Sequence, residues 1–123
     1  MKRKKILIVD DDKDLRTGLA MRLRANEYDT VFAADGVSAI SEAQRQQPDA
    51  ILLDLGLPAG DGFLVLERLK SIPRLASIPV LVITARDAKS NEGRAAALGA
   101  EVFLQKPFEN EELLAALRKV LGD

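Results

Sequence analysis

Reactive side chains follow four short apolar segments of this sequence. Asp10, Asp11 and Asp12 come directly after Ile6 to Val9, Asp54 follows Ile51 to Leu53, Thr84 follows Val80 to Ile83, and Lys106 stands shortly beyond Val102 to Leu104. In an open α/β sheet, ligands bind beyond the carboxyl ends of parallel strands, so residues in these positions converge from distant parts of the chain. Carboxylates, a hydroxyl and an ammonium at one sheet edge suit phosphoryl chemistry with a divalent metal ion.

The elements that would position these groups are five short strands separated by helix-length stretches. The predicted strands are Lys5 to Val9, Thr30 to Ala33, Ala50 to Leu53, Val80 to Ile83 and Glu101 to Leu104. Most of them are leucine-rich or β-branched, as buried strands are. A β-α unit repeated five times predicts an α/β fold, a single-domain doubly wound (βα)5 three-layer sandwich with a parallel five-stranded sheet.

The composition of the strands also indicates their order in the sheet. A central parallel strand is covered on both faces and is continuously apolar, whereas an edge strand carries polar residues. The first, third and fourth strands fit central positions, whereas Thr30 in the second, and Glu101 and Gln105 around the fifth, fit edges. The predicted order is therefore 2-1-3-4-5, which is flavodoxin-like. Its switch point lies between the first and third strands, where Asp10 and Asp54 follow.

Apolar residues recur at helical spacing between the strands, and each set predicts one buried helix face. These faces are Leu15, Leu19 and Leu23; Val37, Ile40 and Ala43; Phe63, Leu66 and Leu69; and Leu113, Leu117 and Val120. The stretch from Lys89 to Leu98 is alanine-rich and ends at Gly99, so we expect it to be the least firmly packed helix. Asp12 fits an N-cap of the first helix, and Asp61-Gly62 fits a turn at the start of the third.

Composition limits the function classes. With 123 residues the chain has room for one core, so we expect one domain over 1–123 and no effector domain. Cysteine and histidine are absent, which excludes thiol nucleophiles and histidine metal ligands and leaves carboxylates for any metal site. A formal net charge of -1 does not favour direct nucleic-acid contact. The apolar runs are too short for a membrane span or a signal sequence, so we expect a cytoplasmic protein.

The motifs at the strand ends resemble those of the receiver domain of bacterial two-component response regulators. The resemblance runs from Lys4 to about Leu121 and rests on ILIVDDD, LLDLGLPAGDG, VITA and FLQKPF, each at the expected strand end and in the expected order. It implies a signalling module that takes a phosphoryl group from a histidine kinase or a histidine phosphotransfer protein. Such a module catalyses only its own phosphorylation and dephosphorylation, and its output is altered binding of a downstream effector.

The resemblance implies that Asp54 is phosphorylated with the help of Mg²⁺ or Mn²⁺. Asp11 and Asp54 would bind the ion directly, Asp10 would bind it through water and Gly56 would offer its backbone carbonyl, in keeping with the oxygen ligands that magnesium prefers. Lys106 would pair with Asp54 or its phosphoryl oxygens. Two carboxylates about 4 Å apart repel by roughly 4 kcal/mol at an effective dielectric constant of about 20, and a divalent cation offsets this repulsion.

The same resemblance implies a conformational switch. Thr84 would donate its hydroxyl to the phosphoryl group, and the backbone N–H of Ala85 would be a second donor. Phe103 would move inward as Thr84 is drawn toward phosphate, which changes the surface of the fourth helix, fifth strand and fifth helix. Many members have tyrosine at this position, so Phe103 keeps the steric switch without the hydroxyl. The Lys106-Pro107 bond is cis in the family.

Two other functions compete with this interpretation. A magnesium-dependent phosphohydrolase similar to the haloacid dehalogenases would use Asp10 and Asp12, but Asp14 stands where that motif usually has threonine, and Asp54 would have no role. A phosphorylation-independent scaffold would require a broken site, whereas every expected group is present. For the receiver interpretation we expect a monomer or a weak homodimer, with no membrane partner.

Overall fold

The computed structural model describes residues 3–57 and 62–122. Within them, five strands alternate with five helices: β1 (Lys4–Val9), α1 (Lys13–Ala25), β2 (Tyr28–Ala33), α2 (Gly36–Gln46), β3 (Ala50–Leu53), α3 (Gly62–Ser71), β4 (Val80–Thr84), α4 (Ala88–Ala97), β5 (Val102–Gln105) and α5 (Asn110–Leu121). The predicted α/β class is confirmed, whereas Asp61 of the predicted Asp61-Gly62 turn lies outside the described residues. In this part of the chain, no helix is long and apolar enough to cross a membrane.

The strands form one parallel sheet in the predicted order, β2-β1-β3-β4-β5. The register aligns the carboxyl ends of the two central strands, because Val9 of β1 pairs with Leu53 of β3. The chain continues this pairing beyond the strands, where the Asp54 N–H donates to the Val9 carbonyl at 3.0 Å. The segments that follow β1 and β3 therefore leave the sheet side by side.

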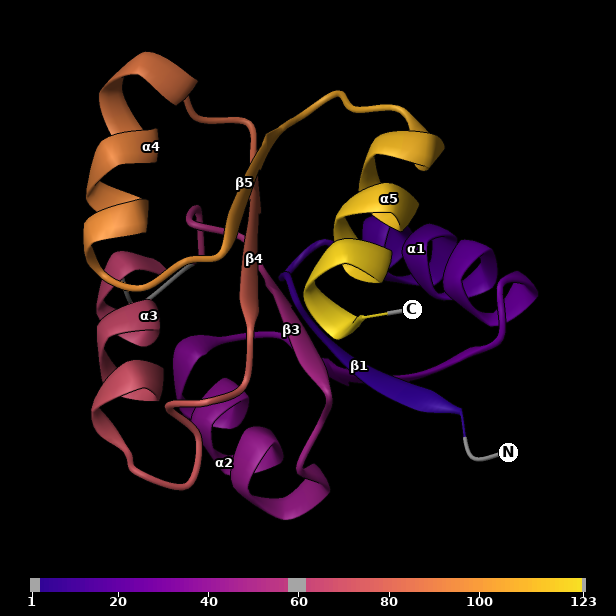
Figure 1. Cartoon of the computed structure of the whole chain (residues 1–123), viewed down its shortest axis with the longest axis horizontal. Coiled ribbons are helices and arrows are strands. Elements are labelled where there is room, and N and C mark those ends of the chain that lie inside the picture. Colours follow the sequence, from indigo (N-terminus) through magenta and orange to yellow (C-terminus); the bar gives the residue numbers. More distant parts are fainter. Residues whose placement is uncertain (1–2, 58–61, 123) are drawn as a thin grey trace.

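The sheet separates two buried apolar clusters. In Figure 1, α1 and α5 lie on one side of the sheet and α2, α3 and α4 lie on the other. Alternate residues of β1 face the two sides: Ile6 and Ile8 pack with α1 and α5, whereas Leu7 and Val9 pack with α2 and α3. β3 and β4 are buried along their whole length, whereas β5 has no fully buried residue. The central and edge strands are thus the predicted ones.

The predicted face of α2 is wrong in one residue, because Val37 is 79% exposed. The buried residues of this helix are Ala39, Ile40 and Ala43. Gly36 explains the orientation, since a Cβ placed there would lie 2.7 Å from Val65 Cγ2 of α3. The face that contains Gly36 therefore turns toward α3, and Val37 turns to solvent.

The remaining predicted helix faces agree with the structure except at Leu15 of α1 and Val120 of α5, which are only partly buried. In α5, Leu114 is buried in addition to the predicted Leu113 and Leu117. α4 has a single buried residue, Ala95, as expected for the least firmly packed helix. Gly99 follows its C-terminal end with φ +103°, a left-handed conformation that favours glycine.

Gly62 supports the connection that carries Asp54, because a Cβ there would lie 2.4 Å from Leu55 Cα and 2.7 Å from the Asp54 carbonyl oxygen. We expect Gly62→Ala to lower the free energy of unfolding by about 1–3 kcal/mol through overpacking. Gly18 lies within α1 with nothing within 4 Å of the same position, so Gly18→Ala should raise it by up to about 1 kcal/mol. Urea unfolding measures both, and changes of the same sign would contradict the predicted packing.

Candidate functional site

Among the described residues, the buried polar or charged side chains all belong to one site. They are Asp10, Asp54 and Thr84, which are 1%, 8% and 1% exposed. Asp10 directly follows β1, Asp54 directly follows β3, and Thr84 is the last residue of β4. Burial of ionised groups is unfavourable unless they are paired or hydrogen-bonded, so this concentration at one sheet edge indicates a site rather than chance.

Asp10 uses both carboxylate oxygens. Its Oδ1 accepts a hydrogen bond from the Asp12 N–H at 2.9 Å, and its Oδ2 lies 3.1 Å from Lys106 Nζ. Lys106 comes from the loop after β5, and its side chain is 22% exposed, so it remains partly accessible to solvent. The short Asp10–Lys106 ion pair was not predicted from the sequence.

Asp54 shares the same lysine. Its Oδ2 lies 3.6 Å from Lys106 Nζ, and its Oδ1 accepts a hydrogen bond from the Gly56 N–H at 3.0 Å. The structure thus places Lys106 beside Asp54, in line with the pairing expected from the sequence, while the contact with Asp10 is shorter. One ammonium bridges two buried carboxylates.

A third carboxylate completes an acidic cluster. Asp10, Asp11 and Asp54 can each offer one oxygen, and these oxygens lie within 4.8 Å of one another. Asp11 is exposed, whereas the other two are buried. Three carboxylates face one ammonium, so the cluster retains excess negative charge. An all-oxygen donor set with this charge fits a hard divalent cation such as Mg²⁺.

The environment of Asp10 shifts its ionisation. Burial raises the pKa of the Asp10 carboxyl above its ordinary value of 3.8, and the charge of Asp54 acts in the same direction. The hydrogen bond from Asp12 and the Lys106 ammonium lower the pKa without cancelling the effect of burial. The fold therefore bears a free-energy cost for keeping this carboxylate ionised.

Asp12, the N-cap of α1, and Arg16 within the helix support the loop that carries Asp10. Asp12 caps the helix, since its Oδ1 accepts hydrogen bonds from the Asp14 and Leu15 N–H groups at 3.0 and 3.1 Å, as predicted. Arg16 donates from Nη1 to the Asp10 carbonyl at 2.7 Å. The sequence offered no signal for this second contact, because an arginine on an amphipathic helix ordinarily faces solvent.

Thr84 and Lys106 are joined at the ends of their strands. The Lys106 N–H donates to the Thr84 carbonyl at 2.7 Å, and the Thr84 hydroxyl accepts the Arg86 N–H at 3.2 Å. The Lys106-Pro107 peptide is cis. Ala85 is exposed, and Phe103 is partly buried against the cluster beneath α3 and α4.

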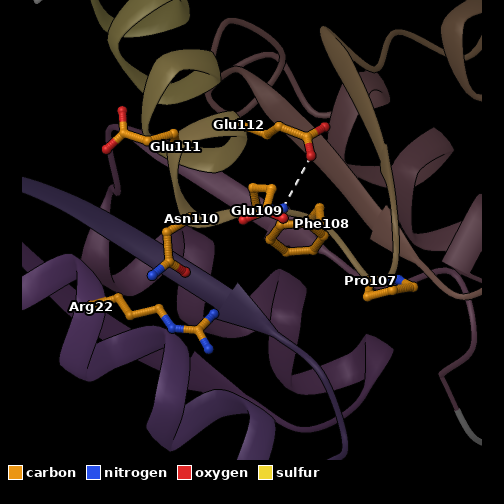
Figure 2. A pocket seen from close by; sticks show the side chains of 7 residues that line it. All are labelled: Arg22, Pro107, Phe108, Glu109, Asn110, Glu111 and Glu112. Atoms are coloured by element: carbon orange, nitrogen blue, oxygen red, sulfur yellow. Dashed lines mark hydrogen bonds between the residues drawn. The ribbon is translucent and has the colours of Figure 1, made fainter.

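A groove borders the site on the side of α1. A pocket of about 430 Å³ is lined by Leu15, Leu19, Arg22, Ala85, Lys106, Pro107 and Phe108. A second pocket of about 440 Å³ shares Arg22, Pro107 and Phe108 and adds Glu109, Asn110, Glu111 and Glu112. Figure 2 shows Arg22, from α1, and Asn110, at the start of α5, lining this second pocket near each other, with a dashed line from Glu112 to Glu109. That line is the hydrogen bond from the Glu109 N–H to the Glu112 carboxylate, which is 3.0 Å long. This groove was not predicted from the sequence.

Comparison with known proteins identifies relatives over nearly the whole chain. The response regulator receiver domain family matches residues 6–118. The response regulator MprA of Mycobacterium leprae is 42% identical over 117 residues, which are 95% of this chain and 50% of that protein. The chain therefore spans about half the length of the curated relatives it matches.

Solved structures agree with the fold. A putative response regulator from Chloroflexus aurantiacus superposes with a TM-score of 0.93 at 33% identity, covering 99% of this chain and all of that one. The receiver domain of the sensor histidine kinase PA1611 from Pseudomonas aeruginosa has a TM-score of 0.89 at 30% identity, covering 98% and 99% of the two chains. That structure contains a magnesium ion in its active-site cleft.

The raised pKa of Asp10 predicts a pH dependence of stability. Without metal, the folded state holds the Asp10 proton more tightly than the unfolded state, so stability falls as pH rises above 3.8 and through the folded-state pKa. Asp10→Asn removes this loss, so the variant should be more stable than wild type at pH 7, and the gap should narrow toward pH 4. Urea unfolding in EDTA measures the gap. A gap that is constant or reversed would contradict the burial cost.

Proposed function

Because the chain belongs to the response regulator receiver domain family, we propose that Asp54 accepts a phosphoryl group from a histidine kinase or a histidine phosphotransfer protein. The observation that carries this proposal is the acidic cluster of Asp10, Asp11 and Asp54 around the Lys106 ammonium. The family is one of signalling proteins, and the chain is a two-component receiver domain. The choice of Asp54 as acceptor rests on its place after the central strand β3 and on its contact with Lys106.

The proposed reaction is an in-line transfer to a carboxylate. An Asp54 oxygen forms a bond to phosphorus, the phosphorus–nitrogen bond of the donor's phosphohistidine breaks, and its electron pair leaves with the imidazole nitrogen. Oδ1 is already held by the Gly56 N–H, and Oδ2 faces Lys106. Hydrolysis of the resulting aspartyl phosphate by water returns inorganic phosphate and the free carboxylate.

The carboxylates repel an incoming phosphoryl group, which is also negatively charged, so the transfer requires positive charge at the site. Mg²⁺ or Mn²⁺ would be held by Asp11 and Asp54, by Asp10 through water, and by the Gly56 carbonyl. When bound, the ion neutralises the repulsion between the carboxylates and the phosphoryl oxygens. Lys106 contributes an ammonium from the loop after β5, and this ammonium would pair with a phosphoryl oxygen after transfer.

Thr84 and Ala85 would bind the transferred group from the end of β4. The Thr84 hydroxyl can donate its proton to a phosphoryl oxygen while its oxygen still accepts the Arg86 N–H. The Ala85 N–H supplies a further donor. A shift of Thr84 toward the phosphoryl group leaves space into which Phe103, partly buried in β5, can turn. This movement would change the surface formed by α4, β5 and α5 and so alter the binding of a downstream effector.

The groove beside Lys106 is the proposed docking place for the phosphodonor. Its wall is mostly apolar near Leu15, Leu19 and Phe108, and it opens directly onto Ala85 and Lys106. A partner helix that carries phosphohistidine could bury apolar residues there while its phosphate faces Asp54. Arg22 on one wall and the glutamates of the adjoining pocket on the other would select a partner with complementary charges.

The test uses acetyl phosphate, a small phosphodonor, with the purified chain and Mg²⁺. Intact mass should show a single added phosphoryl group that requires the metal and is absent from Asp54→Ala. Asp12→Asn is the matched control, because asparagine keeps the helix cap and the residue lies outside the acidic cluster. It should be phosphorylated like wild type.

Two outcomes would overturn the proposal. If the wild-type chain gains no phosphoryl group while a known receiver does under the same conditions, Asp54 is not an acceptor. If phosphate is instead released steadily from a phosphate monoester such as p-nitrophenyl phosphate, and Asp54→Ala retains this turnover, the phosphohydrolase interpretation with Asp10 as nucleophile is favoured.

A further inference from the structure

α4 contributes little to the hydrophobic core. Its one buried residue is Ala95, whereas α3 buries five residues, among them Phe63. The free energy gained by burial scales with the apolar area removed from water, and one methyl side chain supplies little of it. Directional contacts between side chains therefore matter more for the position of α4 than for that of α3.

The first such contact lies at the N-terminal end of α4. The Ala88 N–H donates to Gln105 Oε1 at 3.1 Å, whereas the N-cap residue Asp87 makes no side-chain cap hydrogen bond. Gln105 is the last residue of β5, pairs with Thr84 in the sheet and immediately precedes Lys106. The side chain that caps α4 thus comes from the strand end that carries the lysine of the site.

The second contact lies on the body of the helix. The Arg94 guanidinium carbon is 4.1 Å from the centroid of the Phe63 ring, well within the range of a cation–π interaction. Arg86, two residues after Thr84, lies 5.9 Å from the same centroid. Phe63 is 2% exposed and follows Gly62, which packs against the Asp54 backbone. The ring therefore joins α4, the loop after β4 and the helix that starts behind Asp54.

We propose that Gln105 and Arg94 are positioning residues. They hold α4 in the position that it has in the unphosphorylated protein, and they couple this position to the Asp54 site. The inference rests on the proposed phosphorylation of Asp54. Gln105 pairs with Thr84 and precedes Lys106, and Phe63 follows Gly62, which packs against the Asp54 backbone. Rearrangement around a phosphoryl group would therefore loosen both contacts together. Coupling between two sites is reciprocal, so a variant that loosens α4 makes phosphorylation more favourable.

The experiment compares Gln105→Ala and Arg94→Met with wild type by two measurements. Methionine matches arginine in helix propensity and chain length but lacks the charge. Hydrogen exchange of the α4 amides in the unphosphorylated protein should be about two- to fivefold faster in each variant, as expected for loss of one hydrogen bond or one exposed cation–π contact. The affinity for beryllofluoride in the presence of Mg²⁺, used as a non-covalent mimic of the phosphoryl group, should rise by a similar factor.

Two further variants serve as controls. Lys89→Ala alters an exposed residue of the same helix and should match wild type in both measurements. Gln105→Glu keeps the acceptor oxygen and places a negative charge at the helix N-terminus, where it is favourable. Exchange of the α4 amides in this variant should therefore be as slow as in wild type, in contrast to Gln105→Ala. These controls separate loss of the specific contacts from general weakening of the helix.

Either of two results would overturn the inference. The first is α4 exchange in Gln105→Ala and Arg94→Met equal to that of Lys89→Ala. The second is faster exchange with an unchanged affinity for beryllofluoride, which would make the contacts structural only. Failure of the proposed function appears differently, as absence of any phosphoryl adduct in wild type, whereas the exchange measurement needs no phosphorylation.

Discussion

Repulsion among three carboxylates at one sheet edge is the constraint on which this structure depends. Asp10, Asp11 and Asp54 bring their oxygens within 4.8 Å of one another, and two of these side chains are buried. The Lys106 ammonium, 3.1 Å from Asp10 and 3.6 Å from Asp54, offsets only part of the charge. Burial first, and the charge of Asp54 to a smaller extent, raise the pKa of Asp10 despite the Lys106 ammonium, so the pKa shift reflects mainly the cost of desolvation. A fold that keeps such a cost holds a site that is ready for a cation and a phosphoryl group.

The rest of the fold divides into parts that fix this cluster and parts that can respond to it. β1 and β3 are buried central strands whose register sets Asp10 beside Asp54, and Gly62 packs closely behind the second of them. In contrast, α4 buries a single alanine. Its position depends on the hydrogen bond from the Ala88 N–H to Gln105 and on the cation–π contact of Arg94 with Phe63. Rigid support under the carboxylates and a loosely packed helix near the site suit a switch, because a modest change of contacts at the site can then move one element.

Much of this arrangement could be predicted from the sequence, because continuous apolar runs identify buried parallel strands and the residues after them share one edge. The same reasoning failed at Val37, where the close approach of Gly36 to α3 decides which face turns inward. It also missed the Lys106–Asp10 contact, the Arg16 bond to the Asp10 carbonyl and the Gln105 cap. Each depends on where a long side chain points after the backbone has folded, and spacing along the chain carries no such information.

Calorimetric titration of Mg²⁺ into wild type, Asp11→Asn and Lys106→Met at pH 7 tests the electrostatic account most directly. If excess negative charge governs the site, Asp11→Asn should weaken Mg²⁺ binding by about tenfold or more, because it removes a charged ligand. Lys106→Met should tighten binding, because methionine keeps an apolar stem but removes the competing cation. Mg²⁺ binding that is unchanged or weaker in Lys106→Met would contradict the central claim.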